Sequence, residues 1–146
     1  DKQLCTFDQN GNVTGFQPHL KRLIISQLGH ELLHAASKGN NKSGIKGLNK
    51  TNNTGLNEGI TQMFTEDIFG YVVSPFTDGY SDYKKIAKMI RVCIGDEPFK
   101  KSYFNHTNDL EVACNKMSNS QTFFEDLNRA LTDLYLLESR YIKKRI

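Results

Sequence analysis

Tryptophan is absent from this 146-residue chain, and proline and cysteine are scarce, with three residues of each. The cysteines, Cys5, Cys93 and Cys114, are odd in number and far apart. Neither a disulfide framework nor a cysteine-rich zinc site is therefore indicated, although a single bridge is compatible with the spacing. The sequence also lacks any run of about 18 or more apolar residues, so it predicts no membrane insertion within this chain.

A strong charge of either sign is also missing. The 19 Lys and Arg residues face 16 Asp and Glu residues, a formal net charge of +3 that is spread along the chain. This balance does not favour a nucleic-acid partner. The length and the 38% hydrophobic content are typical of one globular domain over residues 1–146. The chain begins with Asp1 rather than Met, which indicates a processed form or an excised domain, with any upstream signal or anchor removed.

The hydrophobic pattern predicts an α+β fold that is mainly α. Two short runs around an Asn/Gly turn within residues 3–16 predict a β-hairpin. Helical spacing follows at 20–37, 56–70, 80–94, 97–104, 108–117 and 121–143. We expect the apolar stripe of the last helix to be core. Residues 38–55, rich in Gly, Asn and Lys, predict a long loop that is either a solvated connector or a substrate lid.

The stretch "GHELLHAAS", residues 29–37, places two histidines on the first helix. His30 and His34 lie one helical turn apart and so share a face. The apolar residues of this helix gather on the opposite face: Ile25, Leu28, Leu32 and Ala36. We expect the apolar face to be buried in the core and the histidine face to be presented for chemistry.

Two imidazoles at this spacing suit zinc, because both rings can reach one tetrahedral ion at about 2.0 to 2.1 Å. Glu31 lies beside the histidines, where its carboxylate can accept a proton from a metal-bound water without occupying a coordination position. A catalytic zinc site needs a third protein ligand and leaves the fourth position for water.

The candidates for the third ligand are His19, His106 and the downstream carboxylates, of which Glu58 is the best placed. Glu58 shares one face of the second helix with Thr61 and Gln62, and the apolar residues take the opposite face: Leu56, Ile60, Met63 and Phe64. Two such helices, packed through their apolar faces, would bring Glu58 to His30 and His34.

"HELLH", followed 24 residues later by the Glu of "NEG", resembles the gluzincin metallopeptidases, the thermolysin-like branch of the zincins, in a compact bacterial form. The resemblance covers roughly residues 20–70. It implies a zincin-like fold with a small N-terminal hairpin or sheet, an active-site helix and a helical C-terminal half. It also implies one zinc ion held by His30, His34 and Glu58, with Glu31 as general base.

The chain departs from the thermolysin-like pattern at one position that supports a ligand. Gln62 stands where those enzymes have an Asp that orients the first histidine, and its amide oxygen is expected to accept the N–H bond of His30 instead. Thr61 and Gln27 are the other polar neighbours expected to support the metal ligands.

The resemblance implies zinc-dependent hydrolysis of a peptide or protein substrate. Related enzymes use a downstream Tyr or His to stabilise the oxyanion, so Tyr80 is the first candidate, ahead of Tyr83 and His106. The alternative is a catalytically inactive zincin-like binding module in which zinc is structural. An intact Glu31 favours the enzyme, since a structural site has no need of a carboxylate beside the water position.

Overall fold

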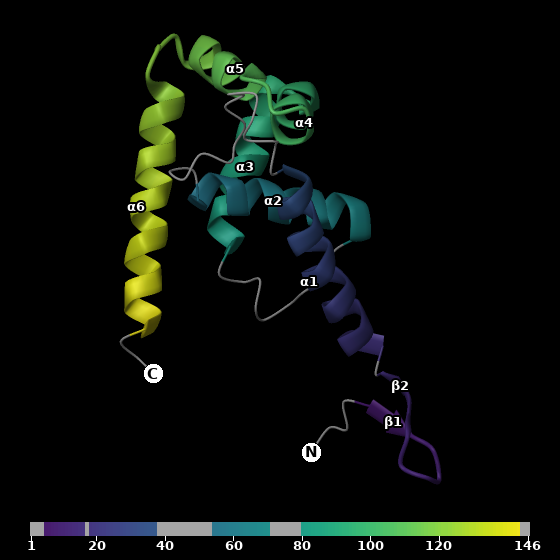
Figure 1. The fold of residues 1–146 in the computed structure, drawn as a ribbon. Coiled ribbons are helices and arrows are strands. Elements are labelled where there is room, and N and C mark those ends of the chain that lie inside the picture. Colours follow the sequence, from purple (N-terminus) through teal and green to yellow (C-terminus); the bar gives the residue numbers. More distant parts are fainter. Residues whose placement is uncertain (1–4, 17, 38–53, 71–79, 144–146) are drawn as a thin grey trace.

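The computed structural model describes residues 5–16, 18–37, 54–70 and 80–143, and they are mainly helical (Figure 1). The elements are the strands β1 (Cys5–Phe7) and β2 (Val13–Phe16) and the helices α1 (Pro18–Ser37), α2 (Thr54–Phe69), α3 (Ser81–Ile94), α4 (Asp96–Phe104), α5 (Asp109–Ser118) and α6 (Phe123–Lys143). A mainly helical chain with a small N-terminal hairpin is therefore confirmed. The predicted loop lies almost wholly outside the described residues. No helix in the described ranges is long and apolar enough to cross a membrane.

The strands β1 and β2 pair antiparallel and form the predicted hairpin, with Cys5 opposite Phe16 and a shift of register between Thr6 and Phe7. The turn is held by Asp8, whose carboxylate accepts the backbone N–H groups of Asn10 and Asn12 at 2.8 Å. Gly11 has a φ of +83°, a conformation that favours glycine. The hairpin lies beyond the N-terminal end of α1, away from the other helices (Figure 1).

Helix α2 lies at the centre of the molecule and packs against α1, α3 and α6. Its apolar face is buried as predicted, with Leu56, Ile60 and Met63 fully inaccessible. Gly55 and Gly59, one turn apart, allow two neighbours to approach closely. A Cβ at Gly55 would lie 2.5 Å from the carbonyl oxygen of Leu131 on α6, and one at Gly59 would lie 2.4 Å from that of Tyr83 on α3. The close helix packing around α2 therefore depends on both glycines.

Ion pairs fix α3 on the second half of α2. Glu66 accepts Lys84 Nζ at 2.6 Å and Lys88 Nζ at 2.9 Å. Arg91 pairs with Asp67 of α2 and with Asp96 at the start of α4. These contacts set the position of α3, and Tyr80, which directly precedes α3, stacks on His30 of α1.

The orientation predicted for α1 is wrong. Its buried face carries Ser26, Gly29, His30, Leu33 and Ser37. The stripe expected in the core is exposed, with Leu28 at 58% and Leu32 at 60% of full accessibility. The helices α1 and α2 therefore meet through their polar faces. The physical reason is that the imidazoles of α1 contact polar side chains of α2, Glu58 and Thr61 among them, while the small residues Ser26, Gly29 and Ser37 allow close packing.

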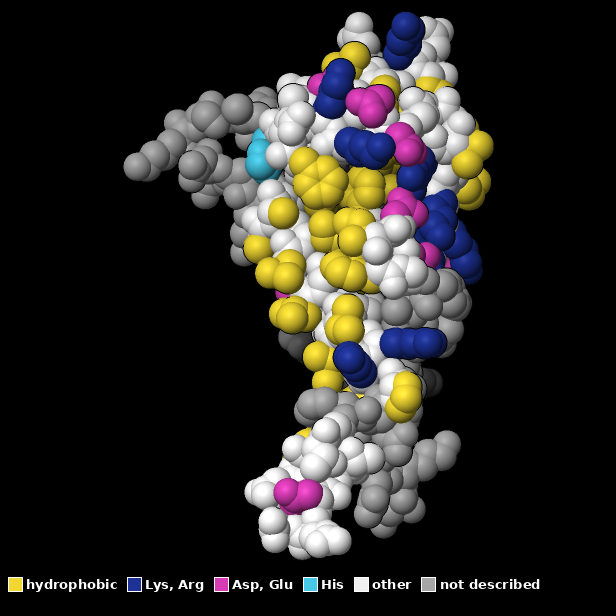
Figure 2. Space-filling model, turned by 90° about the vertical axis from the view of Figure 1, so that its right-hand side faces the viewer, with side chains coloured by type: hydrophobic (Ala, Val, Ile, Leu, Met, Phe, Trp, Pro, Cys, Tyr) yellow, Lys and Arg dark blue, Asp and Glu magenta, His cyan; other side chains and the backbone are white. Residues whose placement is uncertain are grey.

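Two sets of apolar side chains stand out among the exposed hydrophobic residues that the structure describes. The first, on α1, comprises Ile24, Ile25, Leu28 and Leu32. The second lies on the C-terminal half of α6 and comprises Leu134, Leu136, Leu137 and Tyr141. Exposed hydrophobic side chains gather in a band along one face of the molecule (Figure 2). The prediction that the stripe of α6 is core holds for Phe124 and Leu131. It is wrong for Ala130, which is exposed, and from Leu134 onward, because α6 extends past the helices it packs on (Figure 1).

Candidate metal centre

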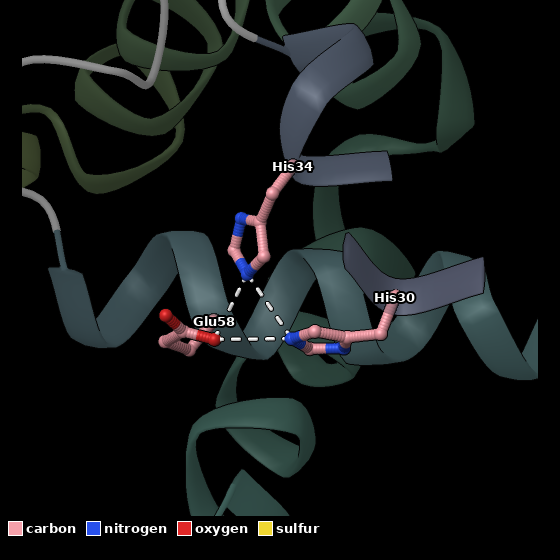
Figure 3. A group of neighbouring side chains, drawn as sticks. All are labelled: His30, His34 and Glu58. Carbon is pink, nitrogen blue, oxygen red and sulfur yellow. Dashed lines mark hydrogen bonds and ion pairs between the residues drawn. The ribbon is translucent and has the colours of Figure 1, made fainter. Parts of the chain in front are cut away.

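His30 and His34 from α1 converge with Glu58 from α2 on one point (Figure 3). The two Nε2 atoms are 3.0 Å apart, and Glu58 Oε2 lies 3.2 Å from His30 Nε2 and 3.0 Å from His34 Nε2. The imidazole rings are nearly perpendicular, at 78°. Three donor atoms from two helices thus form a nearly equilateral triangle.

The triangle has the dimensions of a zinc site. Ligands at about 2.0 to 2.1 Å from a tetrahedral zinc ion lie about 3.3 to 3.4 Å from one another. The observed sides of 3.0 to 3.2 Å are slightly shorter. Two imidazole nitrogens and one carboxylate oxygen are also a donor set that zinc accepts, with a fourth position left open. The residues present therefore fit the metal that the sequence implies.

The charges at the triangle also favour a cation. Burial of Glu58 would raise its pKa, but hydrogen bonds and charge interactions with His30 and His34 outweigh burial and lower the pKa to about 2. The carboxylate is therefore ionised at neutral pH. If both Nε2 atoms carried a proton, the two protons would face one another, because the nitrogens are 3.0 Å apart. A cation at the centre attracts all three lone pairs at once.

The far side of the His34 ring is held by polar groups of α2. Its Nδ1 atom lies 3.3 Å from Thr61 Oγ1 and 3.4 Å from the side-chain amide nitrogen of Asn57. Thr61 in turn makes a 2.6 Å hydrogen bond with the hydroxyl of Tyr103 from α4. Burial raises the pKa of Tyr103, so this hydroxyl stays protonated. The structure thus brings Thr61 to His34, and adds Asn57 and Tyr103.

The bond expected between His30 and Gln62 is not formed. Both side chains are buried, and both His30 Nδ1 and Gln62 Oε1 lack a hydrogen-bonding partner. The prediction that Gln62 orients His30 is therefore wrong for this structure. His30 is held instead by packing, since the Tyr80 ring stacks on it with an interplanar angle of 4° and a centroid distance of 5.7 Å.

Tyr80 precedes α3 and is half-buried beside the triangle. Burial raises its pKa, and the charge of Glu58 and a hydrogen bond with Tyr135 of α6 raise it further. The charge of Glu31 acts in the same direction, so this carboxylate is also near Tyr80. The Tyr80 hydroxyl therefore remains a proton donor next to the candidate metal ligands.

The other candidate residues are exposed to solvent or lie away from the triangle of His30, His34 and Glu58. Glu31 and Gln27 are exposed on α1. Tyr83 is buried and donates its hydroxyl to Glu138 at 2.7 Å, and His106 lies between α4 and α5 with a φ of +58°. The side chain of His19 lies outside the described part of the structure. Sequence reasoning ranked Tyr80 ahead of Tyr83 and His106, and Tyr80 stacks on the candidate ligand His30.

Sequence reasoning missed Tyr103, Asn57 and Tyr135. Asn57 directly precedes Glu58, so the "NEG" stretch itself contained the signal. Tyr103 and Tyr135 lie on helices whose packing no local pattern reveals, and a fully buried tyrosine gives no sign in the sequence of what its hydroxyl contacts.

No protein-family model matches the chain, and no curated protein or solved structure matches it significantly. The triangle of His30, His34 and Glu58 and the side chains around it are therefore the features that bear on its function.

Proposed function

We propose that the protein is a zinc-dependent peptidase whose metal ion is held by His30, His34 and Glu58. The observation that carries the proposal is the triangle of donor atoms with sides of 3.0 to 3.2 Å. Its assignment as a gluzincin-type, zincin-like enzyme is part of the proposal and rests on the "HELLH" and "NEG" stretches. When bound, zinc supplies Lewis acidity, which lowers the pKa of a bound water towards about 7 and polarises the scissile carbonyl.

Glu31 is the general base of the proposed reaction. It follows His30 directly on α1, it is exposed to solvent, and its charge acts on Tyr80 beside the candidate ligands. Its carboxylate accepts the proton of the attacking water and then delivers it to the leaving amine. The exposed position favours this role over a structural one, since a substrate must reach the same side.

Tyr80 donates a hydrogen bond to the oxyanion that forms on the substrate carbonyl. Its raised pKa keeps the hydroxyl protonated at neutral pH, and its stacking on His30 holds it beside the residues that would hold the metal. Tyr135, which hydrogen-bonds to Tyr80, holds the ring from the side of α6.

The test compares zinc-loaded wild type with zinc-loaded Glu31→Gln on a library of unstructured peptides, with products read by mass spectrometry. We expect the wild type to cleave, a chelator to abolish cleavage and added zinc to restore it. Glu31→Gln should keep its zinc and lose activity by about 100-fold to 10,000-fold. Glu125→Gln, an exposed glutamate on α6, is the matched control and should cleave like wild type.

Two other results separate the alternatives. Zinc retained by a wild type that cleaves no peptide would favour the inactive binding module, in which the metal joins α1 to α2. A folded wild type that binds no zinc would overturn both proposals.

A further inference from the structure

Two helices of the structure expose apolar residues at the same spacing. Ile25, Leu28 and Leu32 form what we call the α1 seam, and Leu134, Leu137 and Tyr141 form the α6 seam. In each seam the second residue follows the first by three positions and the third follows the second by four. This is the spacing of the a and d positions of a heptad repeat, through which two helices pack along one another. The exposed fractions run from 40% at Leu134 to 72% at Tyr141, so both seams are open to solvent in the described part of the structure.

The two seams of one chain cannot pack on each other. Helix α2 lies between α1 and α6, and both helices pack on it (Figure 1). The α6 seam of one copy can therefore reach only the α1 seam of another copy.

The charged residues beside the seams favour one alignment of the two helices. Lys21 and Arg22 lie at the N-terminal end of the α1 seam, and Glu31 lies near its C-terminal end. The order is reversed on α6, where Asp133 lies at the N-terminal end of the seam and Arg140 near its C-terminal end. All five side chains are exposed. A parallel alignment brings opposite charges together at both ends, whereas an antiparallel alignment brings Glu31 to Asp133 and the basic pair to Arg140.

We propose that the α6 seam of one copy docks in parallel on the α1 seam of a second copy. Because the two seams are different surfaces, the contact is heterologous, and each copy keeps one seam for a further copy. Each copy contributes three apolar residues to the contact. An interface this small gives weak association, with a dissociation constant of about 10 to 100 µM.

Docking also places the second copy beside Glu31, which directly precedes Leu32 on α1. In the parallel alignment, Arg140 of the second copy lies at the same end of the seam as this carboxylate. This consequence rests on the proposed function, in which Glu31 is the general base. Association should therefore lower the rate of peptide cleavage per chain.

The association is measured by analytical ultracentrifugation of the full, metal-free chain, between about 5 and 500 µM. Wild type should form species whose mass rises with concentration. Leu28→Asp in the α1 seam and Leu137→Asp in the α6 seam should each associate more than about 10-fold more weakly, because the contact offers the new charge no partner. Val92→Asp is the matched control and should associate like wild type, since Val92 is 87% exposed on α3, outside both seams. A wild type that stays monomeric, or either seam variant associating like wild type, would overturn the proposal.

A mixture of the two seam variants tests which surfaces pair. Leu28→Asp keeps an intact α6 seam, and Leu137→Asp keeps an intact α1 seam. The mixture should therefore form a heterodimer with one copy of each variant, which cannot grow further. Pairing of α1 with α1 would leave Leu137→Asp dimeric on its own, and pairing of α6 with α6 would leave Leu28→Asp dimeric. Either of these results, or a mixture that stays monomeric, would overturn the proposal.

Asp133→Lys tests the parallel alignment. In that alignment the new lysine faces Lys21 and Arg22, so association should weaken by about 2-fold to 5-fold. In the antiparallel alignment the same lysine would face Glu31, and association would become tighter. Tighter association would therefore overturn the parallel alignment.

The rate of peptide cleavage per chain, measured on zinc-loaded protein, tests the consequence for Glu31. For wild type it should fall by about 2-fold at the concentration where half of the chains are docked, and for Leu137→Asp it should stay constant. An equal, constant rate in both proteins would overturn this consequence. Absence of cleavage at every concentration would overturn the proposed function, while the mass measurements on metal-free protein would still decide whether the seams dock.

Discussion

On one face of α1, Ser26, His30 and Ser37 are buried, whereas on the opposite face Leu28 and Leu32 are more than half exposed. The difference follows from what each face meets. The first face contacts Glu58 and Thr61 of α2, which bond to its imidazoles, and the small side chains beside them allow close approach. Burial on this helix is therefore decided by hydrogen-bonding partners and not by hydrophobicity alone.

The largest expected effect comes from removing a ligand on the buried face. His34→Ala should weaken zinc binding by more than about 100-fold, because only two of the three protein ligands remain. Leu32→Ala, two residues away on the exposed face, should bind zinc like wild type. Titration against a competing chelator measures both. Equal affinity in the two variants would remove the distinction between the faces.

The second effect tests the central position of α2. In Gly59→Ala the new Cβ would lie 2.4 Å from a backbone oxygen of α3, which cannot move without displacing the helix. We expect a loss of about 3 kcal/mol or more in the free energy of unfolding, measured by urea denaturation. Gly29→Ala on α1 should cost less, since its Cβ would meet the ring of Phe69, a half-exposed side chain that can rotate away. The reverse order would contradict this account of the packing.

The third effect is a pH dependence on the buried face. Glu58 has a pKa of about 2 in the folded chain, below its usual 4.5, so the unfolded chain takes up the proton first. The contribution of ionised Glu58 to the free energy of unfolding is fully present above pH 4.5 and is lost as the pH falls towards 2. The metal-free wild type should therefore lose more unfolding free energy between these values than Glu58→Gln. Urea denaturation across the interval measures it, with Glu125→Gln as control, and parallel curves for wild type and Glu58→Gln would be the contrary result.

The smallest effect separates two adjacent leucines of α1. Leu32→Ala should change the free energy of unfolding by less than about 0.5 kcal/mol, because Leu32 is 60% exposed. Leu33→Ala should cost about 2 kcal/mol or more, since Leu33 is 8% exposed and belongs to the core. Thermal or urea unfolding distinguishes them. A larger loss for Leu32→Ala would mean that the face predicted from the sequence is the buried one after all.

Local patterns predicted the hairpin and six helices. Hydrophobic periodicity, turn residues and helix-end residues each depend on a few residues that are close together in the sequence. The spacing of His30 and His34 was equally local, and Glu58 could be chosen because it lies on the face of its helix opposite the apolar residues. The rotation of α1 could not be predicted in this way, since it depends on Thr61, Tyr103 and Glu58 lying opposite. The same holds for Gln62, whose expected bond to His30 required a side-chain conformation that the packing does not adopt.

The most direct test of the metal site is X-ray absorption at the zinc edge, on the full chain loaded with one equivalent of zinc. We predict a first shell of nitrogen and oxygen only, at about 2.0 to 2.1 Å, with the outer scattering of two imidazoles. His34→Ala should lose one of the two imidazoles. Sulfur at about 2.3 Å, from Cys5, Cys93 or Cys114, or a spectrum unchanged by His34→Ala, would show that zinc binds elsewhere and would contradict the site formed by His30, His34 and Glu58.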